Sequence, residues 1–142
     1  MDHVVYLDVK EAELSKLLTG QKSMIIRGAA GRKMPYGRVQ EGDRLYFLEN
    51  DGSGCVRAQG VVASVFNSEK METETSRKLV EDNQDRLNLN PAQIKRWAGK
   101  RYLVLIEVSQ VTPLDPFQID KSEYGNMDDW LPVGEIDRVK ND

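Results

Sequence analysis

Residues 20–38 read GQKSMIIRGAAGRKMPYGR, and this basic stretch carries five cations without a single acidic residue. The cations are Lys22, Arg27, Arg32, Lys33 and Arg38. The whole chain of 142 residues has a net charge of −3, so the rest of it sums to −8. Clusters of Lys and Arg bind anions through charge and through the fork geometry of the guanidinium group. The stretch therefore predicts an anion-binding surface, and its glycines allow the backbone to approach a ligand closely.

The composition of the remaining chain excludes several classes of site. Cys55 is the only cysteine and His3 the only histidine, which rules out an intrachain disulfide and a cysteine or histidine metal cluster. No stretch approaches the roughly 18–20 apolar residues of a membrane span, and the N-terminus lacks the form of a signal peptide. We expect a cytoplasmic protein of one domain over residues 1–142, without cofactor, metal or membrane partner. The composition leaves the oligomeric state open.

Hydrophobic periodicity predicts an α+β fold in which short helices interrupt a series of strands. Gly60 predicts a bulge inside a strand, and Asn90–Pro91 predicts a capped helix start. Asp8 with Glu11 resembles a capping box for the first helix. Because short hairpins join several strands, we expect a small, strongly bent sheet or barrel. The expected strands are 3–9, 23–27, 44–49, 55–66 and 101–108, and the expected helices are 10–19, 73–83 and 90–98.

The pattern becomes irregular near the C-terminus, where Pro113 and Pro116 interrupt it. The segment 113–136 is too aromatic to be disordered, so we expect it to pack on a core formed by about residues 3–112. Trp130 within it is either a lid that stacks on a ligand or a hydrophobic plug at one end of the barrel. Asp128 and Asp129 are candidates for pairing with the basic stretch.

The start of the basic stretch resembles the motif of ASCH domains, which are small PUA-like β-barrels. The family pattern is Gly-x-Lys-x-x-Glu-x-Arg, and Gly20, Lys22 and Arg27 match it at the right spacing. Ile25 stands where the family often has Glu. A Gly-Asp pair before a barrel strand is also typical of the family, and Gly42–Asp43 supplies it. The resemblance implies a PUA-like small bent β-barrel with short helices.

The resemblance also implies a cleft lined by Lys22 and Arg27, with RNA or a modified nucleotide or nucleoside as its ligand. From the residues alone, Lys22 has the alternative of favouring a helix terminus, and Arg27 that of pairing with a carboxylate. Tyr36 and Trp130 are candidates for stacking on a base, although Tyr36 is equally suited to anchoring its own turn. Charge alone makes rim candidates of three further cations, for which a solvated loop is the alternative: Arg32, Lys33 and Arg38.

Some members of the ASCH group resemble amidohydrolases that act on acylated cytidine. In those, the motif Lys works with a Thr three residues later and with a Glu from a helical insert. Lys22 is present here, but Ile25 occupies the Thr position and has no nucleophile, while Glu81 falls near the expected carboxylate. The predicted function is therefore a binding module for RNA or a modified nucleotide. Hydrolysis of an acylated nucleoside, or protein interaction with a vestigial cleft, are the alternatives.

Overall fold

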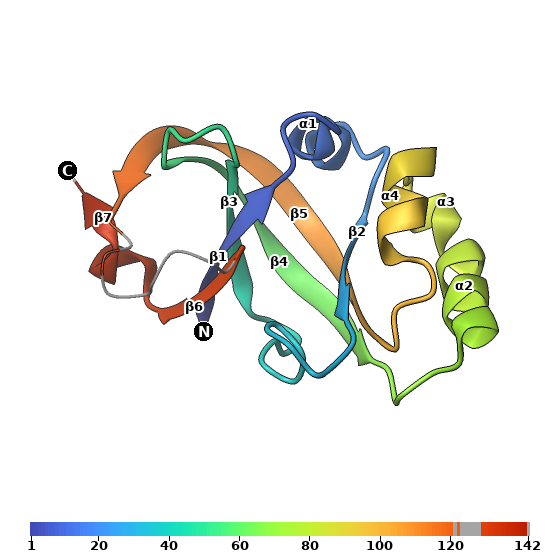
Figure 1. Ribbon diagram of the computed structural model, residues 1–142. Coiled ribbons are helices and arrows are strands. Elements are labelled where there is room, and N and C mark those ends of the chain that lie inside the picture. The colour runs from blue at the N-terminus through green and yellow to red at the C-terminus, as the bar shows by residue number, and fades with distance from the viewer. Residues whose placement is uncertain (121, 123–128, 142) are drawn as a thin grey trace.

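A computed structural model describes residues 1–120, 122 and 129–141, and Figure 1 shows a curled sheet with a group of short helices beside it. The helices in this part of the chain are α1 (Glu13–Leu18), α2 (Thr73–Asp82), α3 (Gln84–Leu87) and α4 (Pro91–Trp97), with a 3-10 turn at Ile136–Arg138. The strands are β1 (Asp2–Leu7), β2 (Met24–Ala29), β3 (Arg44–Glu49), β4 (Cys55–Asn67), β5 (Tyr102–Ile119), β6 (Trp130–Gly134) and β7 (Lys140–Asn141).

The sheet has the strand order β2-β5-β4-β3-β1-β6, and β7 pairs with the far end of β5. The pairing of β1 with β3 is parallel, whereas the other pairs are antiparallel. Although β1 and β2 are separated by only one short helix in the sequence, they are not neighbours in this order. Curling of the sheet brings them together, and the Arg27 side chain on β2 donates to the Tyr6 carbonyl on β1. A seam between β1 and β2 therefore closes one side of the half-barrel.

The apolar residues of β2 and β5 serve two cores because alternate side chains point to opposite faces of a strand. Ile25, Val104 and Ile106 belong to the barrel interior. Met24 and Ile26 belong to a second core, in which helices α2 to α4 cover the outer face of the same two strands. Strands buried on both faces have continuous apolar runs, which accounts for the sequences MII and YLVLI. A third cluster lies between β1, β3, β6 and the 3-10 turn.

Several local predictions are confirmed. The strand over residues 44–49 has those bounds, and the β4 register shifts between Gln59 and Val61, as Gly60 predicted. Helix α4 begins after Asn90 with a complete capping box to Gln93.

Strand β6 at residues 130–134, which is not among the expected strands, pairs with β1. Among the described residues, no helix is both long and apolar enough to cross a membrane, and no group of acidic, His or Cys side chains is arranged to hold a metal.

Two local predictions are wrong. Helix α1 starts at Glu13 after Ala12, without a side-chain cap, and Asp8 accepts a hydrogen bond from the Lys10 amide instead. Strand β5 continues through both prolines to Ile119, because β4 pairs with it on either side of a register shift between Val56 and Ala58. Proline is tolerated at such irregularities, so it did not end the strand.

Candidate functional site

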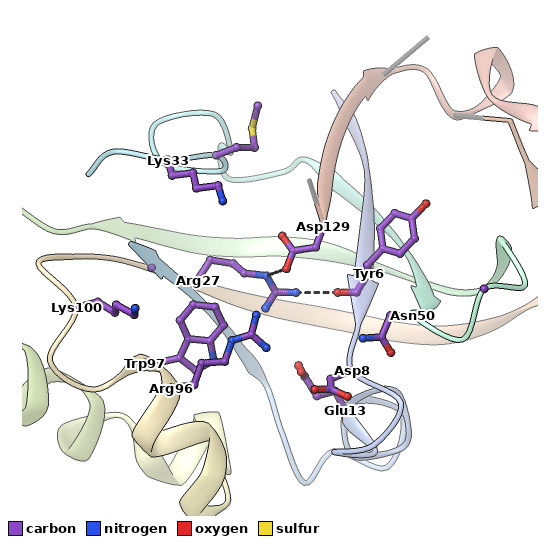
Figure 2. A pocket seen from close by; sticks show the side chains of 13 residues that line it. Tyr6, Asp8, Glu13, Arg27, Lys33, Asn50, Arg96, Trp97, Lys100 and Asp129 are labelled. Atoms are coloured by element: carbon purple, nitrogen blue, oxygen red, sulfur yellow. Dashed lines mark hydrogen bonds and ion pairs between the residues drawn. The ribbon is translucent and has the colours of Figure 1, made fainter. Parts of the chain in front are cut away.

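A cavity of about 620 Å³ opens at the seam between β1 and β2. Figure 2 shows the side chains that line it. They come from seven places in the sequence: the end of β1, the start of α1, the end of β2, the loop that follows β2, the turn before β4, the region of α4, and the residue before β6. A cavity of this size lies within the range of small-ligand sites, which is about 300–1,000 Å³.

The charges in the cavity are divided between two sides of Arg27. In Figure 2, Lys33, Lys100 and Trp97 lie on one side of it, and Asp8 and Glu13 lie on the other. The cations that line the cavity are Arg27, Lys33, Arg96 and Lys100, and the acids are Asp8, Glu13 and Asp129. The cavity is therefore bipolar rather than uniformly basic, so an anion would be attracted to one part of it and repelled from another.

Arg27 forms the floor of the cavity at the seam. Its side chain is 7% exposed, and its two terminal nitrogens donate to the carbonyl oxygens of Ile26 and Tyr6, each at 2.8 Å. Its Cζ lies 5.9 Å from the centre of the Trp130 ring. The Arg27 Nε lies 3.1 Å from Asp129 Oδ2, so the carboxylate pairing that was one alternative for Arg27 is present. Asp128, the other candidate partner, lies outside the described residues.

The second motif cation, Lys22, lies apart from the cavity. Its side chain is buried, and Nζ donates to the Leu87 carbonyl oxygen at 2.7 Å. Burial lowers the pKa of Lys22 to about 8, and the nearby Glu13 carboxylate opposes part of this effect. Arg27 therefore lines the cavity, whereas Lys22 does not, so the two motif cations do not share one concavity as expected.

The other cations of the basic stretch are distributed differently. Lys33 lines the cavity, whereas Arg32 and Arg38 are exposed outside its lining. The Tyr36 hydroxyl donates to the Ser68 carbonyl, and its ring makes an edge contact with Tyr102 at 5.7 Å between centroids. The Arg32 guanidinium covers both rings, at 5.5 Å and 5.7 Å. Tyr36 thus anchors the basic stretch against β4 and β5.

Trp130 lies in the core and not in the cavity lining. Its side chain is fully buried in the barrel interior, and Nε1 donates to His3 Nδ1 at 3.1 Å. His3 Nδ1 therefore carries no proton, and Nε2 donates to Asp43 Oδ2 at 2.8 Å. Both ring nitrogens of His3 are hydrogen-bonded, and the Trp130 indole is enclosed. Trp130 therefore has the role of the hydrophobic plug, and no face of its ring is open for stacking on a base.

The residues considered for hydrolysis do not meet. Ile25 is fully buried inside the barrel, and Glu81 is exposed on α2, away from the cavity lining. The carboxylate that acts on Lys22 is that of Glu13 on α1. Glu13 itself is 7% exposed and lines the cavity.

Several cavity residues were missed by sequence reasoning. Arg96, Trp97 and Lys100 lie about 70 residues after Arg27, and only the folding of α4 against β2 brings them to the seam. Trp97 also packs in the core beneath the helices, and its helical spacing from Ile94 is typical of core packing, so it carries no separate signal for the cavity. The charged sequence around it, KRWAGK, was the only available hint.

Sequence comparison does not place this chain: no family model matches it, and no curated protein sequence matches it significantly. Comparison of structures does. The crystal structure of ASCH from Zymomonas mobilis has a TM-score of 0.67 and 13% identity, over 96% of this chain and 91% of that chain. A variant of that protein with one substitution gives 0.69 and 12%, over the same shares. This chain has the ASCH fold.

The predicted PUA-like bent barrel with short helices is thereby confirmed. The N-terminal domain of Staphylothermus marinus McrB is also similar, with a TM-score of 0.50 and 13% identity over 96% of this chain and 90% of that chain. At identities this low, the likeness concerns the ASCH fold alone and carries over no ligand and no activity.

Proposed function

We propose that this ASCH-fold protein binds RNA or a modified nucleotide, one nucleotide of which enters the cavity at the seam. The observation that supports this most directly is the convergence of four cations and Trp97 on one concavity from three separate segments. Arg and Lys are the side chains that hold phosphate, and aromatic or guanidinium planes are the surfaces on which unstacked bases lie.

The phosphate would lie on the basic side, near Lys33 and Lys100, which are exposed and free to reach it. The base would lie near Arg96, which lines the cavity and whose guanidinium covers the Trp97 ring at 4.6 Å. The acidic side, with Asp8 and Glu13, accepts N–H or O–H groups of a base or ribose. A bipolar cavity of this kind suits a nucleotide better than an anion alone.

Replacement of the exposed cavity lysines tests the proposal. Lys33→Ala and Lys100→Ala should each weaken binding of a short single-stranded RNA by about threefold to tenfold. Each should also reduce the slope of log affinity against log salt by about 0.7, since one phosphate contact is lost. Fluorescence anisotropy at several salt concentrations measures both quantities.

Lys95→Ala is the matched control, because Lys95 is exposed on α4 beside Arg96 but does not line the cavity. It removes the same charge from the same region and should leave the affinity nearly unchanged. If Lys95→Ala weakens binding as much as Lys100→Ala, or if no RNA or nucleotide binds at all, the proposal fails.

A second candidate function, hydrolysis of an acylated nucleoside, is favoured by one observation. The pKa of Lys22 is lowered to about 8 by burial, which is near the value suited to a general base. Turnover of a panel of acylated nucleosides that is lost in Lys22→Met would support it. Lys16→Met is the control, because the Lys16 ammonium also donates to a backbone carbonyl, that of Asn88, which follows the Leu87 carbonyl bound by Lys22 by one residue. Turnover lost equally in both variants, or absent in the wild type, would exclude this role.

A further inference from the structure

The Nε–H group of Arg27 is buried and has no hydrogen-bond acceptor within the described residues. The terminal nitrogens of Arg27 donate to two backbone carbonyls, which fix the side chain at the seam. Nε faces Asp129 Oδ2 at 3.1 Å, but the oxygen does not lie along the N–H bond, so the contact is an ion pair without a hydrogen bond. A buried donor without an acceptor destabilises the protein, because it has lost its hydrogen bonds to water and gained none in return. The position at Nε is therefore built for an acceptor that Asp129 supplies imperfectly.

The two partners differ greatly in exposure. The Arg27 side chain is 7% exposed and the Asp129 side chain 47%. The Asp129 backbone is fixed, because its carbonyl accepts a hydrogen bond from the Tyr6 amide at 2.9 Å. Its carboxylate lines the cavity and lies beside Arg27 in Figure 2, and because the Asp129 side chain is half exposed, a side-chain rotation can carry it into solvent. Solvent weakens the hold of an exposed carboxylate on its partner, so the carboxylate can be replaced.

We propose that Asp129 is an internal competitor for the ligand, and that a phosphate monoester displaces its carboxylate from Arg27 Nε. This inference rests on the proposed function and specifies the position of the phosphate, which lies on the buried Arg27 guanidinium with Lys33 beside it. A phosphate monoester carries nearly two charges and three acceptor oxygens. It can therefore meet the Nε donor in line and still contact the lysine, which a carboxylate tethered to the backbone cannot do.

The competition predicts that removal of the Asp129 charge tightens phosphate binding. The Asp129 carboxylate occupies the phosphate position and repels an incoming anion. Asp129→Asn should therefore bind inorganic phosphate and adenosine 5′-monophosphate about threefold to tenfold more tightly than the wild type. Most substitutions at a binding cavity weaken binding, so a gain of this size is a specific outcome.

Asp51→Asn is the matched control, because Asp51 is exposed between Asn50 and Gly52, which both line the cavity, but does not line it itself. It removes the same charge near the cavity without freeing Arg27 Nε, and its effect on affinity should stay below about twofold. The NMR signal of the Arg27 Nε–H group gives a direct second measurement. We expect it to shift when phosphate is added to the wild-type protein.

The outcomes separate this inference from the proposed function. If Asp51→Asn tightens binding as much as Asp129→Asn, or if phosphate binds without moving the Arg27 Nε–H signal, displacement is excluded while nucleotide binding stands. If neither wild type nor variants bind phosphate or the nucleotide, both fail. Should Asp129→Asn not fold, as judged by its melting temperature, the Nε–H titration of the wild-type chain decides alone.

Discussion

Arg27 and Lys22 belong to one eight-residue motif, yet the structure gives them different environments. The buried Arg27 guanidinium has two carbonyl oxygens and a carboxylate around it. The Lys22 ammonium has one carbonyl acceptor and a more distant carboxylate, so burial acts on it with less compensation. An ammonium group changes its pKa when buried far more readily than a guanidinium does.

Lys22 should make the stability of the protein depend on alkaline pH. Its pKa falls from 10.5 to about 8 on folding, so between these values the unfolded chain binds more protons and stability rises with pH. The expected rise is about 3 kcal/mol. Urea unfolding of wild type and Lys22→Met at pH 8, 9 and 10 measures it. From pH 8 to pH 10 the wild type should gain about 2 kcal/mol of stability relative to Lys22→Met, which is most of that rise, and Lys16→Met should follow the wild type. Parallel curves for wild type and Lys22→Met would contradict the assignment.

At the scale of the element, β2 is the strand on which the cavity depends. It presents Ile25 to the barrel and Met24 and Ile26 to the helices, and then places Arg27 at the seam. Helix α4 completes the cavity, because its capping box at Asn90 fixes the start of a helix whose last turn carries Arg96 and Trp97. Neither element makes the cavity without the other.

Gly28 on β2 should not tolerate a side chain. A Cβ there would lie 2.5 Å from the Leu103 side chain and 2.8 Å from the Tyr102 carbonyl oxygen, so the strand pair would have to separate. Gly28→Ala should lower the free energy of unfolding by about 1–3 kcal/mol. Gly31→Ala is the control, since nothing lies within 4 Å of its Cβ position; its effect should stay within about 0.5 kcal/mol. Chemical denaturation measures both, and equal effects would show that the close approach of β2 to β5 is not limiting.

At the scale of the whole molecule, β1 connects the two ends of the chain. Trp130 donates to His3 across 127 positions of sequence, and His3 in turn donates to Asp43 at the start of β3. The Asp2 carboxylate accepts a hydrogen bond from the Ile136 amide. Asp129, which precedes β6, reaches Arg27 only because β6 is paired with β1. The C-terminal segment thus completes the barrel and the site together.

The His3 connection should make the fold sensitive to mild acid. Burial lowers the pKa of His3 below its ordinary 6.5, against the opposing effect of Asp43, and protonation of Nδ1 would remove the acceptor for Trp130. The unfolded chain then binds more protons, so stability is lost as the pH falls below about 6.5. His3 is the only histidine, so His3→Gln should remove this dependence between pH 5 and 7. Denaturation midpoints at three pH values measure it, and identical slopes for both proteins would exclude His3 as the cause.

The motif that identified the fold consists largely of residues with structural roles. Gly20 has a φ of 79° directly after α1, and Gly42 has a φ of 90° in the turn before β3. Asp43 accepts hydrogen bonds from the Gln40 amide and from His3. These requirements are local and severe, so the residues can be recognised although overall identity to proteins of the ASCH fold is only 12–13%. The motif therefore predicted the fold well and the composition of the cavity poorly.

Three features could be read from residues a few positions apart in the chain. They are the strand over residues 44–49, the bulge at Gly60 and the capped start of α4, because alternation, backbone freedom and capping act within a few residues. The length of β5, the position of β6 and the members of the cavity could not be read in this way. Each of these depends on pairing or packing between segments far apart in sequence, whose free energy appears only once the sheet has curled.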